Sequence, residues 1–152
     1  MNPVRVLVTG AGSGVGQGII KSLKICNYPV KIITADISPF NAALYRSDEA
    51  IIIPKVEELN ALPLIIKLIK ESKIDVVMIG SEFDLVFFSE NQEKIFMETG
   101  AVVIVSPIST ISIADDKWLT AEFLKNNNLP YAESFISDSI DALSIIKIIP
   151  IF

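Results

Sequence analysis

The 152-residue chain contains no histidine, and cysteine occurs only once, as Cys26. Without histidine the chain cannot build a Ser-His-Asp triad or a Cys-His pair, and it lacks the commonest protein ligand of zinc. A single cysteine forms no internal disulfide, which is typical of proteins in a reducing cytoplasm. Because Cys26 falls at the end of a stretch with helical periodicity, we expect a buried, unreactive thiol there.

Charge and long apolar runs are also scarce. Charged residues make up 20% of the chain and the net charge is −5, so the basic patch of a nucleic-acid binder is not expected. The mean hydropathy is +0.52, but charged residues, proline or glycine interrupt each apolar run before the ~20 residues of a membrane span. Residues 1–3 lead directly into a strand pattern, without the charged start of a signal peptide. We therefore expect a soluble, cytoplasmic protein without a membrane partner.

Hydrophobic residues, by contrast, make up 51% of the sequence and gather in short runs. Five such runs, rich in β-branched residues, predict strands buried on both faces, at 5–9, 31–36, 50–53, 75–79 and 102–105. Helical spacing of apolar residues lies between most of them, at 15–23, 62–69 and 82–98, whereas 38–48 has room for one helical turn at most. Strands alternating with helices predict an α/β fold with a parallel sheet covered by helices on both faces.

The pattern changes after residue 105, where a Ser-Pro pair ends the last predicted strand. One or two helical turns are expected at 108–113, and Asp115 or Asp116 offers an N-cap for a helix that ends near Asn127. A last helical pattern lies at 140–148. We expect a front domain over residues 1–113 and a short helical linker over 114–152 that begins a second domain. The apolar ending at 150–152 indicates an interrupted chain.

A glycine-rich turn with the sequence Thr-Gly-Ala-Gly-Ser-Gly-Val-Gly occupies residues 9–16, after the first predicted strand and before the first predicted helix. Glycine accepts positive φ and lets backbone N–H groups approach a ligand, and the start of a helix favours an anion. Asp36 ends the second strand about 20 residues later, where dinucleotide-binding folds place their ribose-binding acid. The pattern favours an anion or nucleotide site. Alternatively, the glycines only pack the helix on the sheet, and Asp36 is a solvated acid.

The turn departs from the G-x-G-x-x-G fingerprint, because the third glycine is missing whether the count starts at Gly10 or at Gly12. Its spacing resembles that of the short-chain dehydrogenases instead. Those enzymes need a Tyr-x-x-x-Lys pair, and none of the three tyrosines here is followed by lysine four residues later. A dehydrogenase is therefore not expected.

Seven motifs in order carry a wider resemblance. They are Val-Leu-Val-Thr-Gly-Ala-Gly-Ser-Gly-Val-Gly-Gln-Gly at 6–18, Ala-Asp-Ile-Ser at 35–38, Ala-Leu-Tyr-Arg-Ser-Asp-Glu-Ala at 43–50, Ile-Gly-Ser-Glu at 79–82, Val-Ser-Pro at 105–107, Ala-Asp-Asp-Lys-Trp-Leu-Thr at 114–120 and Phe-Leu-Lys-Asn-Asn-Asn-Leu-Pro-Tyr at 123–131. From Val4 to about residue 135, the chain resembles the N-terminal, Rossmann-like front part of ATP-grasp proteins akin to the carbamoyl-phosphate synthase large subunit.

The resemblance implies a front domain packed on a two-lobed body that clamps ATP and Mg²⁺, activates a carboxylate as an acyl phosphate and joins it to an amine or a thiol. It implies that the front domain contributes to the pocket of a small carboxylate substrate through the glycine-rich turn and the loop after the fourth strand. The substrate-binding residues so implied are Gly10, Gly12, Ser13, Gly14, Gly16, Ser81, Glu82 and Asp84. The alternative for the last three is an N-cap followed by first-turn acids, which the helix dipole favours by itself.

Lys117 is at the start of the helix where the resemblance places a basic residue that reaches the nucleotide phosphates. A lysine in the first turn of a helix is electrostatically unfavourable unless an anion lies nearby. The alternative is an exposed lysine offset by the two preceding aspartates. Lys117 and Asp36 are thus the candidate cofactor-binding residues, and no metal ligands are expected. The remaining ATP and Mg²⁺ ligands would belong to the body, so no cofactor is expected to bind this chain tightly.

Three functions fit these patterns. The first is the substrate-binding front domain of an ATP-dependent carboxylate–amine or carboxylate–thiol ligase, without catalysis by this chain alone. The second is a regulatory module that binds NAD(P) or another nucleotide. The third is a split or truncated product that docks on a partner chain carrying the ATP-grasp body. Whether that body lies in cis or on a partner, and whether the chain forms a homodimer, are left open.

Overall fold

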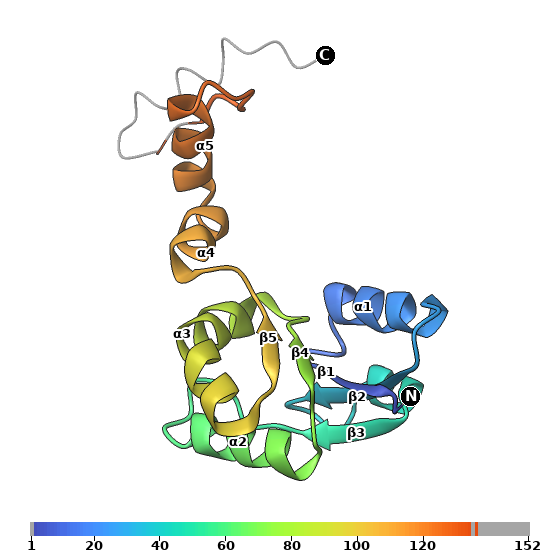
Figure 1. Ribbon diagram of the computed structural model, residues 1–152. Coiled ribbons are helices and arrows are strands. Elements are labelled where there is room, and N and C mark those ends of the chain that lie inside the picture. Colours follow the sequence, from blue (N-terminus) through green and yellow to red (C-terminus); the bar gives the residue numbers. More distant parts are fainter. Residues whose placement is uncertain (1, 135, 137–152) are drawn as a thin grey trace. The chain divides into compact units, whose positions relative to one another are not determined.

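Five parallel strands form one sheet in the order β3-β2-β1-β4-β5 (Figure 1). The computed structural model describes residues 2–134 and residue 136. The strands are β1 (Val4–Val8), β2 (Val30–Asp36), β3 (Glu49–Ile52), β4 (Val76–Met78) and β5 (Val102–Ile104). The five strands overlap the five apolar runs of the sequence, and the expected α/β fold with a parallel sheet is confirmed.

The central strand β1 pairs with β2 on one side and with β4 on the other, so that Val8 lies beside both Thr34 and Met78. The chain leaves β1 through helix α1 (Gly14–Ile25) towards β2, and it leaves β4 through helix α3 (Glu82–Thr99) towards β5. The connections after β1 and β4 therefore run in opposite directions from neighbouring strands. In parallel sheets, such a reversal of strand order opens a crevice at the carboxyl ends of the strands.

Helix α1 covers one face of the sheet, and helices α2 (Ala61–Glu71) and α3 cover the other (Figure 1). Two hydrophobic clusters fill the two layers, and alternate residues of β1 point into each. Leu7 packs with α2 and α3, whereas Val6 and Val8 pack with Ile20 of α1. Side chains on successive strand residues point to opposite faces, so a strand with helices on both sides needs apolar residues at every position. This explains the nearly continuous apolar runs of the central strands. The expectation that all five strands are buried on both faces is wrong for the edge strands β3 and β5, in which buried or half-buried residues alternate with exposed ones.

Local signals fix the ends of the elements. The Ser13 hydroxyl caps α1 by accepting a hydrogen bond from the Gly16 N–H at 2.8 Å. Gly100 ends α3 in the left-handed region, at φ 76°, which only glycine adopts without strain. The single turn expected between β2 and β3 is the short 3₁₀ helix η1 (Ala42–Arg46).

The chain divides into two compact units, Met1–Ile108 and Ser109–Phe152. This boundary and the predicted one, after residue 113, both fall within helix α4 (Ile108–Asp115). Helix α5 (Lys117–Asn126) follows, capped by Asp116, whose carboxylate accepts hydrogen bonds from the N–H groups of Trp118 and Leu119 at 2.7 and 3.0 Å. The expected helix at 140–148 and the apolar end at 150–152 lie outside the described residues.

The expectation of a buried thiol at Cys26 is wrong. The side chain of this residue is exposed rather than buried, because α1 ends at Ile25 and the backbone at Cys26 is already extended. The thiol therefore lies beyond the helix face that packs on the sheet. In the part of the chain that the structure describes, no helix is long and apolar enough to cross a membrane.

Candidate functional site

A cleft of about 590 Å³ opens at the carboxyl edge of the sheet. Its walls come from four connections: the turn after β1, the segments after β2 and β3, and the first turn of α3. This is the edge where the strand order reverses, and ligands of open α/β folds bind there. The cleft brings together six of the residues predicted from the sequence, namely Gly10, Gly12, Ser13, Asp36, Ser81 and Asp84.

Three glycines let the connections after β1 and β4 approach each other closely. Gly10 has φ +50°, and a Cβ on it would lie 2.5 Å from the Cβ of Ser81. A Cβ on Gly16 would lie 2.4 Å from the carbonyl oxygen of Gly10, and one on Gly80 only 2.3 Å from that of Thr9. These distances are too short for any side chain, so the glycines set the spacing of the two walls.

Most polar groups of the glycine-rich turn already have partners within the protein. The Ser13 hydroxyl donates to the carbonyl oxygen of Gly80 while it accepts from Gly16. The N–H of Ser13 donates to the carbonyl of Gly10 at 3.0 Å, and the N–H of Gly12 donates to Asp36 at 3.1 Å. The N–H groups of Gly12, Ser13 and Gly16 therefore hold the turn in shape and are not aimed at an anion in the cleft.

Asp36 has a similar internal role. Its carboxylate accepts hydrogen bonds from the N–H groups of Gly12 and Ser38, at 3.1 and 3.2 Å, and from the Asn41 side-chain amide at 2.7 Å. Asn41 also caps η1 by accepting from the Ala43 N–H at 2.9 Å. This network fixes the end of β2 against the glycine-rich turn, and it occupies the position where a dinucleotide-binding protein would offer its acid to a ribose.

Asp84, in the first turn of α3, contributes a partly buried acid to the cleft. Burial raises the pKa of its carboxyl group above the ordinary 3.8, and the negative charges of Asp36 and Glu57 raise the pKa further. The Thr9 hydroxyl, which faces Asp84, acts in the opposite direction. That hydroxyl is fully buried and forms no hydrogen bond of good geometry with the described residues.

The remaining predicted residues do not line the cleft. Gly14 and Glu82 are exposed, and Gly16 is buried beneath the turn. Gly14 has nothing within 4 Å of the position of a Cβ and no positive φ, so the turn would accept a side chain at this position. Lys117 is exposed at the start of α5 and belongs to the other unit.

The sequence patterns did not predict several residues that line the cleft, among them Asn41, Lys55, Glu57 and Phe83. The first three follow β2 and β3, and Phe83 follows β4. The carboxyl ends of parallel strands share one edge, so the segments after β2 and β3 reach the cleft as those after β1 and β4 do. No motif marks these residues, and only the strand order shows that they meet.

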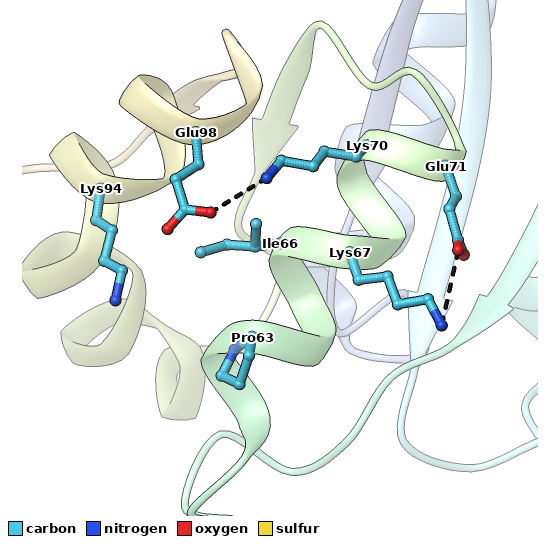
Figure 2. A pocket seen from close by; sticks show the side chains of 7 residues that line it. All are labelled: Pro63, Ile66, Lys67, Lys70, Glu71, Lys94 and Glu98. Carbon is cyan, nitrogen blue, oxygen red and sulfur yellow. Dashed lines mark hydrogen bonds and ion pairs between the residues drawn. The ribbon is translucent and has the colours of Figure 1, made fainter.

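A second hollow, of about 530 Å³, lies between α2 and α3 (Figure 2). Lys70 pairs with Glu98 across the two helices at 3.1 Å, and Lys67 pairs with Glu71 along α2 at 3.7 Å. Exposed ion pairs of this kind contribute at most about 1 kcal/mol. None of the residues predicted to be functional lines this hollow, so we assign it to helix packing and take the cleft as the candidate site.

The cleft lies within a region with a recognisable family. A family model described as PylC-like, N-terminal domain, matches residues 6–104, which include all four connections around the cleft. The chain belongs to this family. The expected membership among the front domains of ATP-grasp proteins is confirmed at this level, while the narrower likeness to the carbamoyl-phosphate synthase large subunit stays a prediction. No curated protein matches the sequence.

Solved structures share the fold. The N5-carboxyaminoimidazole synthetase from Staphylococcus aureus, complexed with ADP, matches with a TM-score of 0.66 and 17% identity, over 97% of this chain and 37% of that one. The biotin carboxylase domain of the Hydrogenobacter thermophilus 2-oxoglutarate carboxylase matches with a TM-score of 0.57 and 20% identity, over 99% and 34%. Pyruvate carboxylase from Rhizobium etli matches with a TM-score of 0.59 and 12% identity, over 92% and 15%. The chain thus spans about a third or less of these proteins.

Proposed function

We propose that the chain is the substrate-binding front domain of an ATP-dependent ligase that joins a carboxylate to an amine or a thiol. The observation that carries this proposal is the cleft at the reversal of strand order, in a chain of the PylC-like N-terminal domain family. Its walls combine hydrogen-bonding side chains, such as Ser81 and Asp84, with apolar ones, such as Ile37 and Phe83. Such a mixture orients one end of a small molecule and shields it from water.

ATP and Mg²⁺ would supply the activation of the carboxylate, and the residues of this chain fit only a small part of their site. The glycine-rich turn has committed the N–H groups of Gly12, Ser13 and Gly16 to internal partners, so it does not fit a row of phosphates. Lys117 fits better, since it is an exposed cation at the start of α5. The other ligands would lie on an ATP-grasp body, in cis or on a partner chain, and the chain alone would not turn over ATP.

The alternative, a module that binds NAD(P), has less support. Asn41 covers Gly12, and Asp36 is engaged by three hydrogen bonds. A dinucleotide would have to displace the Asn41 side chain before its pyrophosphate could approach the turn.

Nuclear magnetic resonance of the ¹⁵N-labelled chain tests the proposal with a panel of small carboxylic acids, amino acids included. We expect shifts of the amide signals of Gly10, Gly12, Ser81 and Phe83. Ile37→Trp, which fills the cleft, should abolish them, whereas Ile25→Trp, at an exposed position outside the cleft, should not. If no acid shifts these signals and NAD⁺ does so at sub-millimolar concentration, the regulatory module is the better proposal.

A further inference from the structure

Helices α1 and η1 carry a group of cations on one face of the sheet. Lys21 and Lys24 of α1 and Arg46 of η1 surround a small hollow beside Ile20. All three cationic residues are exposed, and none of them forms an ion pair with any residue that the structure describes. Neither helix contains an acidic residue. We call these three cations the basic surface.

The acids that follow η1 leave the basic surface uncompensated. Asp48 accepts a hydrogen bond from the backbone of β2 at 2.7 Å, and Glu49 forms its ion pairs with cations of β1 and β2. The guanidinium of Arg46 donates to the neutral side chain of Gln17 at 3.5 Å. The positive charge of the basic surface is therefore available to another molecule.

The outward side of α3 carries the opposite charge. Its residues recur at helical spacing, on the side away from the buried Phe88 and Ile95, and they are Glu82, Val86, Glu90, Glu93 and Met97. The three glutamates are exposed and form no ion pair within the described part of the chain. The cation of the same helix, Lys94, lines the hollow towards α2 instead (Figure 2). We call the three glutamates the acidic surface.

Exposed apolar side chains accompany both charged surfaces. Tyr45 precedes Arg46 in η1 and is 83% exposed, and Met97, on the outward side of α3, is 83% exposed as well. Protein interfaces combine apolar contacts with charged groups at their rim, and tyrosine, methionine and arginine are enriched in them. A free ion would use only the charges. The combination of charge and apolar area fits a folded protein as the partner.

The two surfaces lie on opposite faces of one sheet, because α1 covers one face and α3 covers the other (Figure 1). Both belong to the compact unit Met1–Ile108, so their positions relative to each other are fixed. Contact between two identical surfaces would bring like charges together. Contact between the basic surface of one copy and the acidic surface of another brings opposite charges together, which favours association.

We propose that copies of this chain associate head to tail, with the basic surface of one copy against the acidic surface of the next. The contact is independent of the cleft and of the proposed function. Each pair of copies leaves one surface of each kind unused, so association continues beyond the dimer unless the rotation between copies closes a ring. Exposed ion pairs are weak and are screened by salt, so the assembly is reversible and strongest at low ionic strength.

Sedimentation equilibrium of the purified chain tests the contact. At low salt, the weight-average mass should rise above the 16.6 kDa of the monomer as the protein concentration increases. It should return to the monomer mass in about 1 M salt, where the Debye length falls to about 3 Å.

Charge reversal on one surface at a time locates the contact. Lys21→Glu with Lys24→Glu makes the basic surface negative, and Glu90→Lys with Glu93→Lys makes the acidic surface positive. Each double variant brings like charges together and should weaken self-association at least about tenfold. The variant with all four changes restores opposite charges and keeps the net charge of the wild type. It should associate about as strongly as the wild type, which a merely structural effect of the substitutions would not produce.

A matched control separates the contact from the effect of net charge. Lys73→Glu with Lys125→Glu reverses two exposed lysines outside both surfaces, and this variant should associate within about twofold of the wild type. If the wild type stays monomeric at low salt and about millimolar concentration, the surfaces face other proteins or solvent and the proposed contact is wrong. The proposed contact is also wrong if association survives in about 1 M salt, if reversal of only one surface weakens it, or if the fourfold variant stays monomeric.

Discussion

The side-chain amide of Asn41 lies directly over Gly12, so close that a Cβ on Gly12 would be 1.5 Å from Nδ2 of Asn41. The same nitrogen donates to Asp36 at 2.7 Å. Gly12 therefore leaves room for the Asn41 side chain. The hydrogen bonds of Asp36 to Gly12 and Asn41 hold together the glycine-rich turn, the end of β2 and the start of η1.

This relationship predicts strong coupling between the two residues. Gly12→Ala should lower the free energy of unfolding by about 1–2 kcal/mol, because Asn41 must move and lose its hydrogen bond to Asp36. In an Asn41→Ala background, the same change should cost less than about 0.5 kcal/mol. Urea unfolding of the two single variants and the double variant measures the coupling. Additive effects would show that Asn41 does not occupy the space above Gly12.

The glycines of α1 should differ sharply in their tolerance of alanine. Gly16→Ala places a Cβ 2.4 Å from the backbone oxygen of Gly10 and should destabilise the protein by about 2–4 kcal/mol. Gly18→Ala, in the same helix with nothing within 4 Å, should stabilise it by up to about 1 kcal/mol. Gly14→Ala should behave like Gly18→Ala. Thermal melts of the three variants suffice, and equal melting temperatures for Gly16→Ala and Gly18→Ala would contradict the packing described above.

Two buried threonines offer another matched comparison. Thr34 hydrogen-bonds to the Ser47 hydroxyl at 2.6 Å and to the Glu49 carbonyl at 3.3 Å, whereas the Thr9 hydroxyl has no such partner. Thr9→Val should therefore be neutral or raise the free energy of unfolding by about 1 kcal/mol, while Thr34→Val should lower it by about 1–2 kcal/mol. The denaturant midpoints of the two variants distinguish these outcomes, provided that the dependence of the unfolding free energy on denaturant concentration is the same for both. A clear loss of stability in Thr9→Val would mean that its hydroxyl is already well bonded.

Asp84 should make stability depend on pH in a specific direction. The pKa of its carboxyl group is raised in the folded protein, so the folded state binds more protons than the unfolded state as the pH rises from about 3.8 to the raised value. The wild type should lose stability across that window, and Asp84→Asn should then be the more stable protein at neutral pH. The difference should vanish below the unfolded-state pKa. Stability curves of the wild type and Asp84→Asn against pH test this, and Glu82→Gln, at an exposed acid in the same helical turn, controls for the loss of one charge.

Lys117 should matter only where nucleotide is bound. In a protein that carries the ATP-grasp body, Lys117→Ala should remove a charge-assisted contact worth about 1.5–3 kcal/mol, which is about a 10- to 150-fold loss in kcat/KM for ATP. Folding should be unaffected, since the side chain is exposed. Lys125→Ala, at the other end of α5, removes the same charge and should leave ATP kinetics unchanged. An unaltered KM for ATP in Lys117→Ala would make this lysine a solvated surface residue.

The sequence by itself determined the secondary structure and the class of fold. Every strand of the sheet overlaps an apolar run, because a strand packed against helices carries apolar residues on each covered face, and β1 is covered on both. Helix ends were equally local, since Asp116 caps the turn that follows it and the Asn127 region stops the same helix. The resemblance to ATP-grasp front domains, carried by sequence motifs, also implied that the turn after β1 and the start of α3 belong to one site.

Only the tertiary structure decided what the site contains. The strand order β3-β2-β1-β4-β5 brings the segments after β2 and β3 to the same edge as the glycine-rich turn, and so places Asn41, Lys55 and Glu57 beside Asp84. No local pattern specifies that order, because pairing between strands depends on contacts far apart in the sequence. The surroundings of Gly14 and Asp36 were decided in the same way. Whether a glycine needs its missing side chain, and whether an acid faces a ligand or its own protein, depends on which atoms lie a few ångströms away in the folded chain.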